Sequence, residues 1–232
     1  MKIDDFVANE TARGWAYKLL ADCHQRPDDE TLKKINALAD ALKTVCPIGA
    51  SYTASLATGL RKTFDLDHIR LDYARLFLGP FAMPAAPYGS VYLEGKRQLM
   101  GDSTLDVLER YRRAGLKIAP DFNDPPDHIA VELEFMSFLI FRAIESSDNS
   151  DTAQVVEFFE LQKSFLEDHL GAWVFEFTDA VEKNAATEFY RNLAKATAAF
   201  LKDDCQVFST VLSAEHAEIE KPAEIESVRK HY

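Results

Sequence analysis

Residues 128–145 read HIAVELEFMSFLIFRAIE, and this stretch decides the fold. Its apolar side chains occupy almost every face of a helix instead of one stripe, which is typical of a helix buried at the centre of a protein. The stretch is too short to span a bilayer, and Ser137 and Arg142 interrupt it. A central buried helix has to be covered, so the rest of the chain is expected to supply the elements that surround it.

The flanking segments carry apolar residues at three- and four-residue spacing, which is the pattern of amphipathic helices. The sequence therefore predicts an all-α, single-domain bundle of roughly ten helices over residues 1–217, followed by a charged, loosely ordered tail over residues 218–232. Besides the central helix, we expect helices over residues 3–24, 32–45, 52–64, 66–77, 101–115, 152–170, 172–183 and 186–203, and a last short helix after Cys205.

Glycine and proline are unevenly distributed along the chain. There are nine of each, and eleven of these eighteen residues lie between Gly79 and Pro126. The scarcity of helix breakers elsewhere favours long helices and argues against a β-sandwich, which needs turns throughout. We therefore expect one irregular, loop-rich region at residues 79–126, in which residues 91–93 form a short extended piece.

Charge and cysteine content narrow the classes of function. The net charge of −12 disfavours nucleic acid as a partner and favours a basic peptide or a cationic ligand, although acidity also serves solubility alone. The three cysteines form no CxxC motif, which fits a reducing compartment. The chain shows no export signal. We therefore expect a soluble, cytoplasmic protein without stable membrane insertion.

A polar cluster precedes the central helix, where unpaired backbone N–H groups favour anions. Asp124 or Asp127 can cap the helix, and the structural alternative is a capped helix with an incidental His128. Adding Glu132 makes a possible metal site, but one histidine with carboxylates is a weak signal. The chain has neither a nucleophile elbow nor a phosphate-binding glycine loop. These residues do not indicate an enzyme, and we expect no bound metal or cofactor.

Aromatic side chains gather around the start of the loop-rich region. Tyr73 and Phe77 lie on a predicted helix and suit core packing. Phe81, Tyr88 and Tyr92 lie in a segment too rich in breakers to be core. Exposed aromatic residues on an irregular platform favour a peptide-binding surface. On an acidic chain, the ligand that fits such a surface is a segment that is both apolar and basic.

Four segments carry a resemblance to a known family. They are DYARLFLGP at 72–80, PYGSVYL at 87–93, MGDSTL at 100–105 and NDPPDH at 123–128. In this order and spacing, the chain resembles the TorD/DmsD family of cytoplasmic redox-enzyme maturation chaperones, and its DmsD branch in particular. The resemblance covers roughly Trp15 to Lys202 and implies an all-helical protein without catalytic activity.

The resemblance also implies a partner. Such a chaperone binds the twin-arginine signal peptide and the apo form of a molybdoenzyme catalytic subunit, here of the dimethyl sulfoxide reductase-like class. It assists insertion of the molybdopterin cofactor and prevents premature export, as a monomer or a homodimer. The residues implied for the signal-peptide site are Tyr73, Leu76, Phe77, Tyr88, Ser90, Tyr92, Asp124, Pro125, Asp127 and His128.

Two features depart from the family pattern. Asp124 stands where the family has glutamate, which shortens the reach of the carboxylate by one methylene. Tyrosine occupies positions 73, 88 and 92, where the DmsD branch often has tryptophan. Two alternatives remain open beside the chaperone: a metal-dependent hydrolase that uses Asp124, Asp127 and His128, and a non-catalytic adaptor protein.

Overall fold

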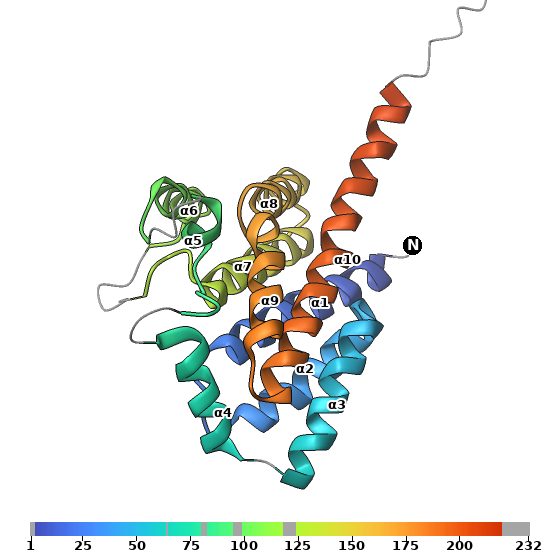
Figure 1. The fold of residues 1–232 in the computed structure, drawn as a ribbon. Helices are drawn as coiled ribbons and strands as arrows, with labels where there is room; N and C mark the ends of the chain where they lie inside the picture. The colour runs from blue at the N-terminus through green and yellow to red at the C-terminus, as the bar shows by residue number, and fades with distance from the viewer. Residues whose placement is uncertain (1–2, 64, 80–82, 95–98, 118–123, 220–232) are drawn as a thin grey trace, which may run out of the picture.

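The computed structural model describes residues 3–63, 65–79, 83–94, 99–117 and 124–219. In these residues the architecture is all-α, and the predicted single-domain helical bundle is confirmed (Figure 1). None of the helices within these ranges combines the length and the apolar character that crossing a bilayer requires.

The elements lie close to the predicted ranges. They are α1 (Ile3–His24), α2 (Thr31–Val45), α3 (Pro47–Thr63), α4 (Leu66–Tyr73), the π-helical turn η1 (Ala74–Leu78), α5 (Gly89–Leu93), α6 (Asp102–Arg113), α7 (Ile129–Asp148), α8 (Thr152–Phe165), the π-helical turn η2 (Leu166–Leu170), α9 (Gly171–Asn184) and α10 (Glu188–Ile219).

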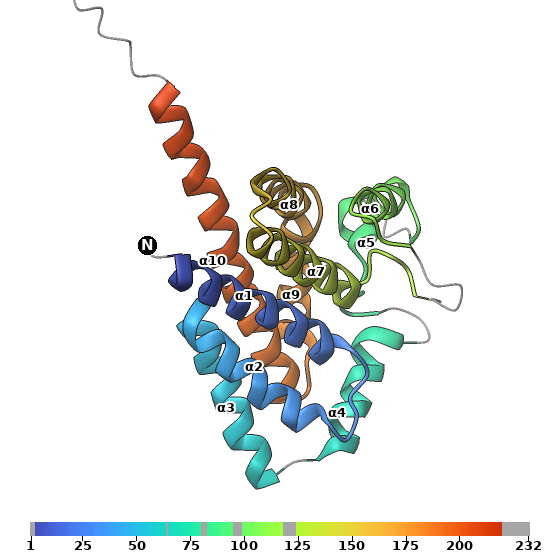
Figure 2. The same cartoon turned by 180° about the vertical axis from the view of Figure 1, so that it is seen from behind.

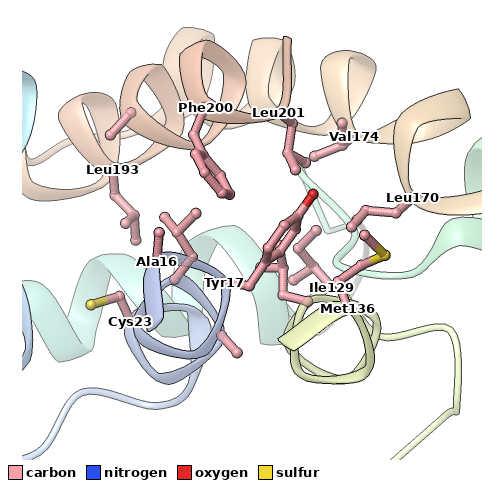
Figure 3. Close-up of a cluster of buried hydrophobic side chains, with 14 of the residues drawn as sticks. Ala16, Tyr17, Cys23, Ile129, Met136, Leu170, Val174, Leu193, Phe200 and Leu201 are labelled. Atoms are coloured by element: carbon pink, nitrogen blue, oxygen red, sulfur yellow. The ribbon is translucent and has the colours of Figure 1, made fainter. Parts of the chain in front are cut away.

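Helix α7 occupies the centre of the bundle, as its apolar sequence predicts. It packs against α1 on one side and α8 on the other (Figures 1 and 2). Ile129 and Met136 of α7 lie beside Tyr17 of α1, under the layer formed by α9 and α10 (Figure 3). Eleven of the 20 residues of α7 are buried, and their positions span more than half of the circumference of the helix.

Helices α2, α3, α9 and α10 form the other half of the bundle, in which α10 packs against α3 and α9. The sequence predicts a helix at 186–203 and a separate short helix after Cys205. The structure instead shows one continuous α10, which extends beyond the other helices (Figures 1 and 2). No glycine or proline interrupts residues 188–219, so nothing in this run ends the helix. Residues 220–232, most of the expected tail, lie outside the described residues.

A buried ion network joins α1 to α10. The Arg13 guanidinium is bracketed by the Glu10 carboxylate at 2.7 Å and the Asp204 carboxylate at 3.1 Å. The Tyr17 hydroxyl donates a further hydrogen bond of 2.5 Å to Asp204 Oδ2. Burial alone would lower the pKa of Arg13, but the two carboxylates outweigh it and hold that pKa above its ordinary value. The network therefore keeps Arg13 charged while it joins the two helices.

The loop-rich region contains two helices, and the predicted extended piece at 91–93 is wrong. These residues belong to α5, a single helical turn. Helix α6 meets the bundle through Tyr111, whose ring lies 4.5 Å from that of Phe135, and through a 2.6 Å contact between Asp106 Oδ2 and His169 Nε2. Both helices are thus positioned by side chains distant in sequence, which local periodicity does not reveal.

The turn η2 depends on one glycine. In a π-helical turn the backbone widens, and here the Leu166 carbonyl oxygen approaches Gly171 closely. A Cβ atom at position 171 would lie 2.4 Å from this oxygen, well inside the van der Waals contact distance. Gly171 therefore permits α9 to follow η2 directly.

We expect Gly171→Ala to destabilise the fold by about 1–3 kcal/mol, because the added methyl group overpacks against backbone that cannot move aside. Urea-induced unfolding, followed by far-UV circular dichroism, measures the effect. Gly49→Ala is the matched control, since a Cβ there meets a side-chain atom, Cys46 Sγ, at 3.1 Å. Equal stabilities for the Gly171→Ala variant and the wild type would contradict the close approach.

Candidate functional site

Two loops meet at the N-terminal end of α7, where residues 87–89 run antiparallel to residues 127–129. Gly89 N–H donates to the Asp127 carbonyl oxygen, and Ile129 N–H donates to the Pro87 carbonyl oxygen, both at 2.9 Å. Tyr88 and His128 form the β-bridge between these bonds. The pairing joins the first residue of α5 to the turn that precedes α7 (Figure 1). It brings together Tyr88, Ser90, Asp127 and His128, four of the residues expected in the site.

Asp127 caps α5 from a different part of the chain. Its side chain is buried, with the residue 1% exposed, and its Oδ2 accepts a 2.8 Å hydrogen bond from Ser90 N–H. This bond satisfies one of the free N–H groups at the start of α5. The interpretation of Asp124 or Asp127 as the cap of the central helix is therefore wrong.

His128 itself caps α7. Its Nδ1 accepts a 3.1 Å hydrogen bond from Ala130 N–H, so the neutral ring carries its proton on Nε2. Burial lowers the pKa of His128, and this effect outweighs Asp124 and Asp127, which act to raise it. The ring of Tyr88 packs edge-on at 5.4 Å. His128 is thus a neutral, oriented side chain at neutral pH.

Asp124 is the exposed member of the cluster. Burial raises the pKa of both Tyr73 and Tyr88, and the negative charge of Asp124 raises each of them further. Tyr88 also raises the pKa of Tyr73. Tyr73 is buried, with 9% of its surface exposed, whereas Tyr88 is half-buried. Asp124 and Tyr88 thus offer an accessible anion and a half-buried aromatic ring, which suit a guanidinium group.

Leu76 and Phe77 lie beneath this surface. Both are buried in the core, where the Phe77 ring contacts Tyr73 at 5.1 Å and Tyr190 at 5.4 Å. The Phe77 ring thus packs against Tyr73 from within the core. Pro125 is half-buried beside Asp124, where the backbone turns into the Asp127–His128 segment.

The loop aromatics are less exposed than the sequence suggests. Tyr88 and Tyr92 are both half-buried. The ring of Tyr92 stacks on Trp173 of α9 with 5.5 Å between the centroids and 19° between the planes. Phe81 lies outside the described residues. Tyr92 therefore fastens α5 to α9, while Tyr88 belongs to the surface around Asp124.

Sequence reasoning treated Glu132 only as a possible metal ligand and missed its contact with Trp173. Glu132 is fully buried, and its Oε2 accepts a 2.9 Å hydrogen bond from Trp173 Nε1–H. Burial raises the pKa of Glu132 well above its ordinary value; the Trp173 bond lowers it and the charge of Asp127 raises it further. The available signal was an acidic residue within an apolar helix, since such a residue needs a partner.

The metal-dependent hydrolase alternative requires that several side chains point toward one metal ion. The described side chains are not arranged in this way. Asp124 is exposed, the Nδ1 lone pair of His128 is occupied by the cap, and Glu132 Oε2 is bound to Trp173. Among the residues that the structure describes, no group of three His, Cys, Asp or Glu side chains is placed to hold a metal ion.

Comparison with known proteins identifies the family. The model of the family described as nitrate reductase delta subunit matches residues 25–179. The chain belongs to this family. It is 28% identical over 193 residues to the Tat proofreading chaperone DmsD of Salmonella typhimurium, covering 83% of this chain and 85% of that one. It is also 28% identical over 145 residues to the chaperone protein TorD of Vibrio cholerae, covering 62% and 64%.

A solved structure agrees with the fold. The crystal structure of an Archaeoglobus fulgidus protein described as a redox enzyme maturation protein superposes with a TM-score of 0.51 at 24% identity, covering 86% of this chain and 93% of that one. At this identity the likeness concerns the fold. With the family match and the two chaperone relatives, the resemblance to TorD and DmsD is confirmed.

We expect His128→Ala to lower the free energy of unfolding by about 1 kcal/mol at neutral pH, because the N-cap acceptor of α7 is lost. His128→Asn is the matched control, since its side-chain oxygen can replace Nδ1 as the acceptor. Urea unfolding of the three proteins measures the difference, and equal stability of His128→Ala and wild type would contradict the cap.

The same variants test the charge state of His128. A histidine whose pKa is lowered on folding contributes stability above the unfolded value of about 6.5 and loses it as the pH falls toward the folded value. The stability advantage of the wild type over His128→Asn should therefore shrink as the pH falls below about 6.5. An advantage that grew with acidification would show that the folded protein favours the imidazolium.

Proposed function

We propose that this chain is a cytoplasmic chaperone that binds the twin-arginine signal peptide of a molybdopterin-containing oxidoreductase. It holds the apo form of the catalytic subunit during cofactor insertion and prevents its premature export. The names of its relatives support this: DmsD is a Tat proofreading chaperone and TorD is a chaperone protein. The client that we propose is an enzyme of the dimethyl sulfoxide reductase-like class.

The observation that carries the proposal is the exposed Asp124 carboxylate in the turn that leads to His128, against which the half-buried ring of Tyr88 packs. A carboxylate can accept two parallel hydrogen bonds from one guanidinium group, and an aromatic ring can stack on its plane. We assign the arginine pair of the signal peptide to this surface. The net charge of −12 assists the approach of such a basic segment.

The remaining residues of the proposed site divide by burial. Tyr88 and Pro125 are accessible enough to contact a peptide, and Leu78, which follows Phe77, is 59% exposed and extends the apolar surface. Ser90, Asp127 and His128 are buried. We propose that these three act from behind the surface, because their hydrogen bonds hold α5 and the Asp124 turn in place.

We expect Asp124→Asn to weaken binding of a synthetic peptide with two consecutive arginines before an apolar stretch. A loss of about tenfold corresponds to about 1.4 kcal/mol, the scale of one hydrogen bond to a charged group. Isothermal titration calorimetry measures it. Asp40→Asn on α2 is the matched control, since it removes the same charge from another exposed position. Wild-type affinity in Asp124→Asn would contradict the assignment.

We also expect this affinity to fall as salt rises from about 0.1 M to about 1 M, because the Debye length shortens from about 10 Å to about 3 Å. The control peptide has both arginines replaced by glutamine and should bind more weakly, with little dependence on salt. Equal binding of the two peptides at low salt would favour the adaptor alternative, which requires no preference for paired arginines.

A further inference from the structure

Three buried oxygen atoms near α5 have no hydrogen-bond partner within the described residues. They are Ser90 Oγ, Asp127 Oδ1 and Glu132 Oε1. The second carboxyl oxygens of Asp127 and Glu132 each accept a hydrogen bond, and Ser90 is fully buried. Buried polar atoms are almost always hydrogen-bonded in folded proteins, so three such atoms together need an explanation.

These atoms surround the peptide between Gly89 and Ser90. The Ser90 amide donates to the second oxygen of Asp127 at 2.8 Å. A Cβ atom at Gly89 would lie 3.3 Å from Glu132 Oε1, so Glu132 approaches the same peptide from α7. The three oxygens therefore come from α5, from the turn before α7 and from α7 itself, and all three side chains lie at the Gly89–Ser90 peptide.

None of the three oxygens forms a hydrogen bond with another described group. One further group in contact with all three would satisfy them together. A cation is disfavoured, because no set of three acidic, histidine or cysteine ligands converges among the described side chains. A buried water molecule typically makes about three hydrogen bonds to groups of this kind. Its size and its capacity to donate and accept match three oxygens from separate elements.

We propose that Ser90 Oγ, Asp127 Oδ1 and Glu132 Oε1 bind one ordered water molecule, and that Glu132 enters this site as a neutral carboxylic acid. Glu132 and Ser90 donate to the water, which donates to the Asp127 carboxylate. Glu132 Oε2 meanwhile accepts from Trp173 on α9. The water thus links α5, α7 and α9 at the back of the candidate site.

The charges around Glu132 require the neutral form. Asp127 faces it from the preceding turn, and Tyr111 faces both carboxyl groups from α6. Trp173 contributes an uncharged N–H from α9, and the facing part of α5 is the Gly89–Ser90 peptide. The groups that act on Glu132 are thus Trp173 and Asp127, neither of which is a cation. Glu132 therefore keeps its proton, because it is fully buried and no cation acts on it.

It follows that Glu132 is a positioning residue for the proposed signal-peptide site, and this part of the inference rests on the proposed function. The water and the Asp127 cap hold α5, and α5 begins directly after Tyr88. If α5 moves away from α7, Tyr88 loses its place beside His128 and Asp124. An intact Glu132 hydrogen bond is therefore needed for a formed peptide surface.

The first test is spectroscopic and needs no peptide. Infrared difference spectra between the wild type and Glu132→Gln at neutral pH should show the carbonyl stretch of one protonated carboxylic acid. Glu134→Gln is the matched control, because Glu134 is an exposed neighbour paired with Lys18. The difference spectrum between the wild type and Glu134→Gln should lack this band. A wild-type spectrum without the band would overturn the neutral form. A high-resolution crystal structure should show density for the water, and an empty position would overturn the water site.

The second test connects Glu132 to binding of the arginine-pair peptide. Glu132→Gln keeps an uncharged hydrogen-bonding group and should bind within about twofold of the wild type. Glu132→Leu has no partner for Trp173 or the water and should bind about tenfold more weakly, while the far-UV spectrum stays helical. Equal affinities of Glu132→Leu and wild type, or equal losses in both variants, would overturn the positioning role.

The unfolding free energy of Glu132→Gln gives a further readout. When the pKa of a carboxyl group is raised on folding, the free energy of unfolding of the protein falls as the pH rises above the unfolded pKa of about 4.3. The variant should therefore gain stability relative to the wild type as the pH rises from that value, and a constant difference would contradict the protonated acid. If the wild type itself fails to bind the peptide, the proposed function fails, whereas the spectra and the pH profile still test Glu132.

Discussion

The burial of α7 on nearly all sides is the constraint from which the candidate site follows. A polar group on a buried helix is removed from bulk water, so each one needs a hydrogen-bond partner inside the protein. Glu132 meets this need through Trp173 of α9, and His128 meets it through the Ala130 amide. The polar groups near the N-terminal end of α7 are thus held in one orientation by the core that surrounds them.

This constraint explains how an irregular segment becomes an ordered surface. Helix α5 is only one helical turn, which is too short to be stable by its own hydrogen bonds. It is held by backbone pairing with the turn before α7, by the Asp127 cap and by the stacking of Tyr92 on Trp173. The exposed Asp124 projects from a turn that these contacts make rigid.

Local sequence predicted the long helices well because their cause is local. The apolar spacing of α2 and α9 and the breakers beside them place these elements within a few residues. The failures have equally physical causes. Helix α5 depends on a cap supplied by Asp127 from a distant segment, and α10 continues through a polar stretch that contains no residue able to end it.

The sequence by itself determined the helical bundle, its central helix and the polar turn at residues 124–128, since these follow from periodicity and from the positions of proline and acidic residues. Only the tertiary structure decided the role of each polar side chain. Asp124 remains in solvent, Asp127 turns inward to cap α5, His128 caps α7, and Glu132 meets Trp173. These roles depend on which distant segments pack together. Neighbouring carboxylates look alike in the sequence, but in the folded protein they differ in burial and therefore in their hydrogen-bond partners.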